Sequence, residues 1–175
     1  MAMECKEFHP YPYQQFCIQH IIDHPAAGLF VDMGMGKTVM TLTAFNYLKY
    51  YAWQIQRCLV IAPKKVAEAT WRTEISGWQH LRHLRCSEVL GTATQRRAAM
   101  AVDADVYVTN RDNVQWLVKE YGKAWPFDMV VLDESSSFKN HQAKRFKALR
   151  AMRPKIKRIV ELTGTPSPHG LMDFC

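Results

Sequence analysis

Short apolar runs alternate with amphipathic stretches along most of the chain, and this alternation constrains the possible folds most strongly. Runs dense in aliphatic residues, which are candidate strands, occupy 26–31, 57–62, 104–109, 127–132 and 158–163, with a weaker run at 87–90. Segments of helical periodicity lie at 37–50, 66–78, 94–102, 113–121 and 142–152. Buried strands that alternate with helices form a mostly parallel sheet that is covered on both faces. The sequence therefore predicts an α/β fold with a mostly parallel central sheet flanked by helices.

Length and composition fit one domain without a membrane segment. The 175 residues are about the length of a single domain, and their hydrophobic content of 48% is ample for a buried core. No repeat or linker interrupts the pattern, so residues 1–175 are expected to form one unit. The N-terminus lacks an apolar signal core, and no window approaches eighteen apolar residues. Five widely spaced cysteines form no CxxC pair. We expect a soluble, cytoplasmic protein with reduced cysteines and no membrane partner.

The stretch VDMGMGKTVMTL, residues 31–42, leads from an apolar run into a helical pattern. Glycine admits positive φ and lacks a Cβ, so a loop through Gly34 and Gly36 can turn its amides toward an anion. The positive end of the following helix points at the same place. Lys37 would then contact the β and γ phosphates of ATP, and the Thr38 hydroxyl would bind Mg²⁺. The candidate nucleotide-binding residues of this loop are Met33, Gly34, Met35, Gly36, Lys37 and Thr38.

An acidic pair follows another buried run, where 127–132 ends at Asp133 and Glu134. Asp133 would hold Mg²⁺, usually through water. Glu134 would orient and polarise the attacking water, because phosphoryl transfer depends mainly on positioning and charge compensation. Each half has a plain alternative, since Val31 stands where the strict GxxxxGKT pattern has its first glycine and an acidic pair can simply be solvated. Together the two halves predict Lys37, Asp133 and Glu134 as the catalytic residues of an ATP hydrolase.

With both halves in place, the chain resembles the first RecA-like lobe of superfamily-two helicases and translocases. It is most similar to the Swi/Snf-type DNA translocase ATPases and their bacterial and phage-encoded relatives. DMGMGKT at 32–38 resembles the family's DEMGLGKT, and DESSSFKN at 133–140 resembles DEAHRIKN. PYQ at 12–14 resembles the adenine-reading motif, LVIAPKKVAEATWRTEISGW at 59–78 the strand, proline and W-x-x-E helix, and LTGTPSPHGLMDF at 162–174 the coupling motif. The resemblance covers nearly the whole chain.

The resemblance implies three further sets of site residues. Gln14 would address the adenine edge with its amide. Loops after two strands would contact the backbone of duplex DNA and give position without sequence readout. The candidate DNA contacts there are Lys64, Lys65, Thr109, Asn110 and Arg111. The candidate coupling residues between nucleotide and DNA are Thr163, Gly164 and Thr165.

The charge balance also favours a polyanionic partner. Lys and Arg number 23 against 16 Asp and Glu, which gives a formal net charge of +7. The segment 139–158 holds nine basic residues and no acidic one. This segment is compatible with phosphate neutralisation, with a solvated helix face, or with a dock for an acidic second lobe.

Some positions depart from the family pattern. Ser136 stands where the acidic motif often has histidine, and His169 stands where asparagine is typical after LTGTP. The family also continues into a second RecA-like lobe that carries an arginine finger, whose loss typically lowers turnover by about 10³ to 10⁵. We therefore expect a second lobe or partner protein to be needed for full hydrolysis and for translocation.

Other functions fit the sequence less well or remain open. The main alternative is a truncated nucleotide-, DNA- or protein-binding module without useful turnover that acts through a partner. A P-loop kinase or transferase is disfavoured, because no acceptor-binding lid is evident and the LTGTP motif argues against it. A zinc site at His80, His83 and Cys86 lacks a fourth ligand nearby.

Overall fold

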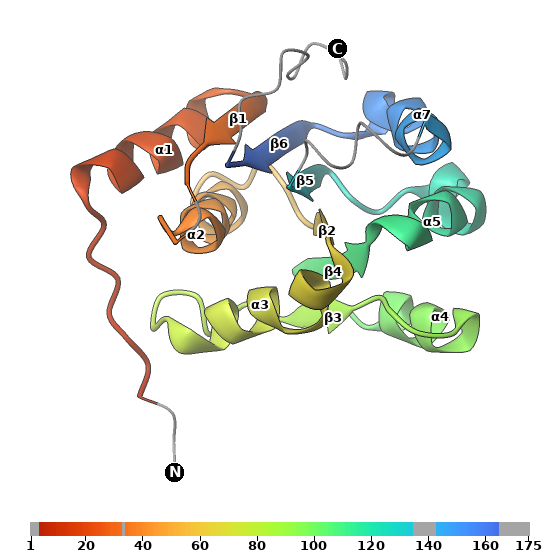
Figure 1. Ribbon diagram of the computed structural model, residues 1–175, viewed down its shortest axis with the longest axis horizontal. Coiled ribbons are helices and arrows are strands. Elements are labelled where there is room, and N and C mark those ends of the chain that lie inside the picture. Colours follow the sequence, from red (N-terminus) through yellow and green to blue (C-terminus); the bar gives the residue numbers. More distant parts are fainter. Residues whose placement is uncertain (1–3, 33, 135–142, 165–175) are drawn as a thin grey trace.

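The computed structural model describes residues 4–32, 34–134 and 143–164, and these form a six-stranded sheet covered by helices (Figure 1). The strands are β1 Ala26–Phe30, β2 Cys58–Ala62, β3 Cys86–Glu88, β4 Val106–Asn110, β5 Met129–Asp133 and β6 Arg158–Thr163. Their order across the sheet is β1-β6-β5-β2-β4-β3. Every pair of neighbouring strands is parallel. The predicted α/β fold with a parallel central sheet is therefore confirmed.

Helices cover both faces of this sheet. The α-helices are α1 Pro12–Asp23, α2 Lys37–Tyr50, α3 Lys64–Gly77, α4 Ala93–Ala101, α5 Val114–Tyr121 and α7 Ala143–Ala151. Short 3₁₀ turns are η1 Arg111–Asn113, η2 Gly122–Ala124 and η3 Arg153–Lys155. In Figure 1, α1, α2 and α3 lie on one side of the sheet, and α4, α5 and α7 lie on the other. No helix within the described ranges combines the length and apolarity that a bilayer crossing requires.

Successive side chains of the central strands point to opposite faces of the sheet and contribute to two separate hydrophobic cores. In β2, Val60 and Ala62 belong to the core beneath α2 and α3, whereas Leu59 and Ile61 belong to the core beneath α5 and α7. Every residue of β2 is buried. Strands buried on both faces are uniformly apolar rather than alternating, as parallel sheets between helices require.

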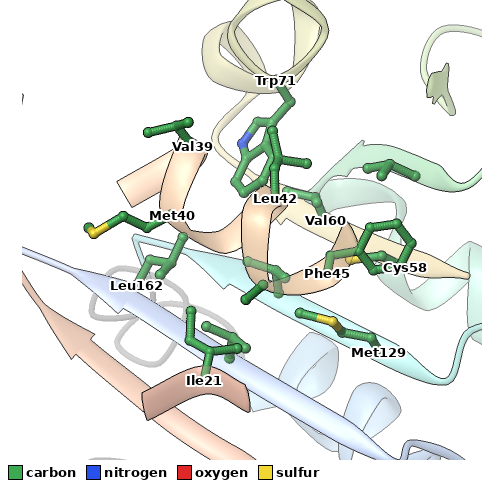
Figure 2. Close-up of a cluster of buried hydrophobic side chains, with 14 of the residues drawn as sticks. Ile21, Val39, Met40, Leu42, Phe45, Cys58, Val60, Trp71, Met129 and Leu162 are labelled. Atoms are coloured by element: carbon green, nitrogen blue, oxygen red, sulfur yellow. The ribbon is translucent and has the colours of Figure 1, made fainter. Parts of the chain in front are cut away.

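The core beneath α1, α2 and α3 is shown in Figure 2. Phe45 of α2, Trp71 of α3 and Ile21 of α1 are each no more than 1% exposed and belong to this one cluster. The apolar face of α2 lies over the sheet residues Val60 and Met129 (Figure 2). This packing fixes the position of α2 relative to the sheet. It therefore also fixes the glycine loop, which directly precedes α2.

Helix α1 is the element that the sequence pattern did not predict. Only Gln14 and Ile21 of its residues are buried, and Cys17, Ile18 and Ile22 are half-buried against the same core. It begins at Pro12, whose fixed φ suits a first helical position. The side-chain Oε1 of Gln14 accepts a hydrogen bond of 2.9 Å from the backbone N–H of Tyr11, which satisfies one helix-end donor.

The order of the strands brings the candidate motifs to one edge of the sheet. The glycine loop follows β1, the acidic pair lies at the end of β5, and β6 lies between these two strands. Because all the strands are parallel, their carboxyl ends share the same edge, where α/β sheets bind ligands. The fold therefore places both halves of the predicted nucleotide site on neighbouring loops.

Candidate functional site

A cavity of about 660 Å³ opens at the carboxyl edge of the sheet. Two groups of predicted residues line it together, namely the glycine loop with Lys37 and the acidic pair Asp133 and Glu134. The predicted residues in its lining are Gln14, Gly34, Met35, Gly36, Lys37, Thr38, Asp133 and Glu134. A volume of this size is in the range of pockets that hold small molecules and cofactors. Met33 lies outside the described residues.

The glycine loop has the backbone that an anion-binding loop needs. Gly34 has a φ of 82° and Gly36 a φ of 83°, a region that residues with a side chain rarely adopt. Gly36 is the N-cap of α2, so the first turn of this helix, whose N–H groups have no acceptor within the helix, begins at the cavity. A Cβ on Gly36 would lie 2.7 Å from Nε2 of Gln14, which leaves no room for a larger residue.

Side chains of α1 hold the outer part of this loop. The hydroxyl of Tyr13 donates a 2.9 Å hydrogen bond to the carbonyl oxygen of Met35. Nε2 of Gln14 donates to the same oxygen at 3.4 Å, while its Oε1 is bound to the N–H of Tyr11. The amide of Gln14 is thus engaged within the protein, between the start of α1 and the glycine loop.

Asp133 is a buried carboxylate at the end of β5. Its Oδ2 accepts a 3.2 Å hydrogen bond from Nε1 of Trp71 on α3. Burial raises the pKa of Asp133 above its ordinary value, and the Trp71 hydrogen bond and the charge of Lys37 act in the opposite direction. A carboxylate withdrawn from water beside a cationic lysine is the kind of group that a bound cation would stabilise. Trp71 is buried in the core, and its indole N–H additionally orients Asp133.

Glu134 follows in a left-handed backbone conformation, with a φ of 54°. The guanidinium of Arg111 lies against this turn, where Nη2 donates to the carbonyl oxygens of Asp133 at 3.4 Å and Glu134 at 3.2 Å. Burial lowers the pKa of Arg111, and the carboxylates of Glu134 and Asp133 oppose that effect. Arg111 therefore faces the acidic turn rather than solvent.

Two parts of the cavity wall were not predicted from the sequence. One is the segment before α1, which contributes Glu7, Phe8, His9, Tyr11 and, at the start of α1, Tyr13. The other is α3 with the residue that follows it, which contribute Val66, Thr70 and Glu74 from the helix and Trp78 directly after it. The two parts are more than fifty positions apart in the sequence, so no local pattern could have joined them. The available signal was the resemblance of PYQ and of the W-x-x-E helix to family motifs.

Backbone hydrogen bonds fasten the segment before α1 to the end of α3. The N–H of Lys6 donates to the carbonyl of Gly77 at 2.9 Å, and the N–H of Gln79 donates to the carbonyl of Lys6 at 2.9 Å. The ring of Phe8 packs edge-on against Trp78 with centroids 5.2 Å apart. This segment is consequently a fixed wall of the cavity in the structure.

The predicted DNA contacts do not form one cluster. Lys64 and Lys65 are exposed at the start of α3, directly after β2. Thr109, by contrast, is fully buried, and its hydroxyl donates a 2.8 Å hydrogen bond to the carbonyl of Val89. The expectation that Thr109 grips a phosphate is wrong for this structure, because its side chain is inside the protein.

The next two predicted DNA contacts are also engaged within the protein. Oδ1 of Asn110 accepts a 3.2 Å hydrogen bond from the N–H of Asn113 and so caps η1. Arg111 is bound to the carbonyls of the acidic turn. Both residues are half-buried, and these contacts tie their side chains to the protein rather than leaving them free at the surface, as the sequence led us to expect.

The coupling residues are described only in part. Thr163 is buried at the end of β6, and its carbonyl accepts a 3.2 Å hydrogen bond from the N–H of Val31 at the start of the glycine loop. Gly164 follows β6, and Thr165 lies outside the described residues. The end of β6 is thereby joined directly to the loop that lines the cavity.

The histidines considered as zinc ligands point to separate partners. Nε2 of His80 lies 2.8 Å from Oγ1 of Thr43, and Nε2 of His83 lies 2.7 Å from Oδ1 of Asn46. Within the ranges that the structure describes, no three His, Cys, Asp or Glu side chains are grouped so that they could hold a metal ion.

Comparison with known families places this geometry. A family described as SNF2-related domain matches residues 13–175, which is nearly the whole chain. The chain belongs to this family. Protein p41 of Acyrthosiphon pisum secondary endosymbiont phage 1 is 41% identical over 175 residues, which are 97% of this chain and 38% of that protein. The predicted resemblance to Swi/Snf-type ATPases is thus confirmed.

More distant relatives of this SNF2-related domain include chromatin regulators and an archaeal ATPase core. The mouse SWI/SNF-related matrix-associated actin-dependent regulator of chromatin subfamily A member 1 is 29% identical over 84% of this chain and 14% of its own length. The Sulfolobus solfataricus SWI2/SNF2 ATPase core, solved in complex with dsDNA, matches with a TM-score of 0.72 at 27% identity. That match covers 93% of this chain and 33% of the archaeal one. The SNF2-related domain described here therefore spans well under half the length of these relatives.

Proposed function

We propose that this chain is the ATP-binding lobe of a DNA-dependent ATPase that moves along duplex DNA. One observation carries the proposal: a single cavity is lined at once by the glycine loop, Lys37 and Thr38 on one side and by Asp133 and Glu134 on the other. A triphosphate needs amide donors and a lysine, and its hydrolysis needs carboxylates close by. Membership of the SNF2-related family supports an ATPase over other P-loop chemistries.

Each side chain of the cavity has a role that follows from its position. The amides after Gly34 and Gly36 would hold the phosphates, and Lys37 would neutralise their charge. Glu134, at the mouth of the same cavity, would orient the attacking water and accept its proton. Gln14 would reach the adenine edge only if its bonds to Met35 and Tyr11 open or rearrange.

The donor set in the cavity also fits Mg²⁺. Thr38 and Asp133 both line it and supply a hydroxyl and a carboxylate oxygen, the ligand types that this hard cation prefers. When bound, the ion would supply charge compensation at the β and γ phosphates. The contribution of the protein is to hold Asp133 in place through Trp71 and to keep Lys37 beside it.

The positive net charge and the similarity to a DNA-bound ATPase core favour duplex DNA as the partner. The archaeal SWI2/SNF2 core that this chain resembles was solved in complex with dsDNA, and the formal net charge here is +7. The exposed Lys64 and Lys65 at the end of β2 are the proposed contacts with backbone phosphates. Lys144, Lys147 and Arg150 are also exposed, on α7. We propose that a second RecA-like lobe or partner protein completes the motor.

Hydrolysis measured with and without duplex DNA tests the proposal. The wild-type chain, the Glu134→Gln variant and a Glu120→Gln control would be compared, each alone and mixed with a separately produced second lobe. Glu120 is an exposed carboxylate on α5, which covers the face of the sheet opposite to α2 and α3. It is not among the residues that line the cavity, so its loss should leave turnover unchanged. DNA-stimulated turnover that disappears in Glu134→Gln and persists in Glu120→Gln supports the ATPase.

Two results would contradict it in different ways. Turnover that survives in Glu134→Gln would remove this residue from the chemistry. Nucleotide binding without turnover under every condition would favour the alternative of a binding module that acts through a partner.

A further inference from the structure

Arg111 connects two loops that the sheet keeps apart. It follows β4, while the acidic pair follows β5, and β2 lies between these two strands. The guanidinium nevertheless reaches the acidic turn, where Nη2 donates to the carbonyl oxygens of both Asp133 and Glu134. One cationic group thus bridges the carboxyl end of the sheet across an intervening strand.

The turn that receives Arg111 has an unfavourable backbone. Within the described ranges, Trp53 and Glu134 are the non-glycine residues with positive φ, and that of Glu134 is 54°. A residue with a Cβ adopts this conformation only when its surroundings enforce it, and such residues gather at functional sites. Charge-assisted hydrogen bonds to two consecutive carbonyls at the turn are a means of enforcing it.

The surroundings of Arg111 favour this internal role. The residue is half-buried, and its Nε is buried without a hydrogen-bond partner among the described residues. The charged groups that act on it are Glu134, Asp133, Arg145 and Asp112. Asp112 is itself paired with Arg145 at 3.0 Å, which leaves the acidic turn as the partner of the Arg111 guanidinium.

We propose that Arg111 is a positioning residue for Glu134: it holds the left-handed turn at that residue and so directs the carboxylate into the nucleotide cavity. The proposal rests on the proposed function for its chemical meaning, because Glu134 is assigned there to the attacking water. It also replaces the role of phosphate contact that the sequence suggested for Arg111. The loop after β4 is then part of the hydrolytic apparatus rather than of the DNA surface.

The conformation of Glu134 can be measured without nucleotide. In a ¹³C,¹⁵N-labelled chain, the Cα and Cβ chemical shifts of Glu134 report its backbone region. Arg111→Met keeps the aliphatic stem and removes the donors, so we expect these shifts to move toward ordinary values. Arg111→Lys, which keeps a cation, should restore part of the wild-type shift. Lys64→Ala, which removes an exposed cation at the neighbouring strand end, should change nothing at Glu134. Unchanged shifts in Arg111→Met would overturn the proposal.

Turnover gives a second readout that a merely structural role would not move. We expect Arg111→Met to lower kcat on the order of 100-fold, as for a misplaced catalytic group, with KM for ATP changed little. In a Glu134→Gln background the same substitution should have almost no further effect, because a positioning residue acts through its partner. Equal losses in both backgrounds would mean that Arg111 acts independently of Glu134.

DNA binding separates the two roles considered for Arg111. A lost phosphate contact reduces the slope of log affinity against log salt by about one. We expect this reduction in Lys64→Ala and an unchanged slope in Arg111→Met; a reduced slope in Arg111→Met would overturn the proposal. If the wild-type chain neither hydrolyses ATP nor binds DNA, the proposed function fails, and the chemical shifts still decide whether Arg111 holds the turn.

Discussion

The indole N–H of Trp71 donates a 3.2 Å hydrogen bond to the Oδ2 atom of Asp133, and both residues are buried. Trp71 belongs to the core beneath α3, whereas Asp133 lines the cavity at the end of β5. The rings of Trp71 therefore pack in the hydrophobic core, while its indole nitrogen donates a hydrogen bond to the acidic pair. The orientation of the carboxylate is fixed by a residue that cannot move without disturbing the core.

Replacing Trp71 with phenylalanine should raise the pKa of Asp133 further. Burial already raises this pKa, and the indole hydrogen bond opposes the rise by stabilising the ionised form. Phenylalanine keeps most of the apolar contact and removes the donor. The ¹³C shift of the Asp133 carboxyl group, followed by titration in wild type and in Trp71→Phe, measures the change.

The control for that titration is Trp116→Phe. Trp116 is half-buried on α5, on the other face of the sheet, and makes a cation–π contact with Arg96 at 4.5 Å. Its replacement should leave the titration of Asp133 as it is in wild type. A pKa of Asp133 that is equal in wild type and Trp71→Phe would show that the indole does not stabilise the carboxylate.

The Asp133→Asn variant should be more stable than wild type at neutral pH while losing Mg²⁺-dependent turnover. Because the folded-state pKa of Asp133 is raised, its favourable contribution is complete below the unfolded pKa and is lost as pH rises through the folded value. Asparagine carries no charge and escapes that loss. Tm values of both proteins without Mg²⁺ should therefore diverge as pH rises from about 4 to 8. A difference that is constant over this range would contradict the burial argument.

The sequence was sufficient for the sheet because its central strands are buried on both faces. CLVIA in β2 and MVVLD in β5 are nearly uniform apolar runs, which leave few alternatives to a parallel sheet between helices. It was insufficient for α1, where one of the two buried residues is the polar Gln14 and the apolar residues beside Ile21 are only half-buried. There the helix is specified by Pro12 and by the Gln14 cap, which are local signals that an apolar pattern does not contain.

The site was predictable where chemistry depends on neighbours in sequence. A phosphate loop needs Gly34, Gly36 and Lys37 close together in sequence, so their spacing alone made them candidates, and the structure places all three at one cavity. Thr109 was assigned wrongly because a threonine that follows a strand in sequence can equally end it, and its hydroxyl is used inside the protein by Val89. Whether a polar side chain at a strand end points outward is decided by tertiary packing, which spacing does not record.

Alanine substitutions at the two loop glycines should have different effects. Both positions have positive φ, so either alanine should lower the free energy of unfolding by about 1–2 kcal/mol. A Cβ at Gly34 meets nothing within 4 Å, whereas one at Gly36 lies 2.7 Å from Nε2 of Gln14. Gly36→Ala should therefore also displace Gln14 and lose more stability than Gly34→Ala. Urea unfolding of the two variants measures this, and equal losses would show that Gln14 yields freely.

A buried ionic network is centred on Asp105, which directly precedes β4. The side chain of Asp105 is fully buried and accepts hydrogen bonds from Lys49, from the hydroxyl of Tyr50 and from the backbone N–H of Arg85. Burial acts to raise the pKa of Asp105, but these donors outweigh it and the pKa lies below its ordinary value. Burial, followed by the hydrogen bond to Asp105, raises the pKa of Tyr50 to about 12.

Removing the cation from this network should be strongly destabilising in a pH-dependent way. Lys49→Met leaves the carboxylate of Asp105 buried without its ammonium partner, and such a loss is worth about 3–5 kcal/mol. The contribution of Asp105 exists above its unfolded pKa and disappears as pH falls through its lower folded value. Denaturant unfolding should therefore show the largest difference from wild type near pH 7 and a difference that shrinks progressively as pH falls below about 4. As a control, Arg57→Met breaks an exposed ion pair with Asp103 and should lower stability by about 0–1 kcal/mol. A Lys49→Met loss as small as that of Arg57→Met would mean that solvent reaches Asp105.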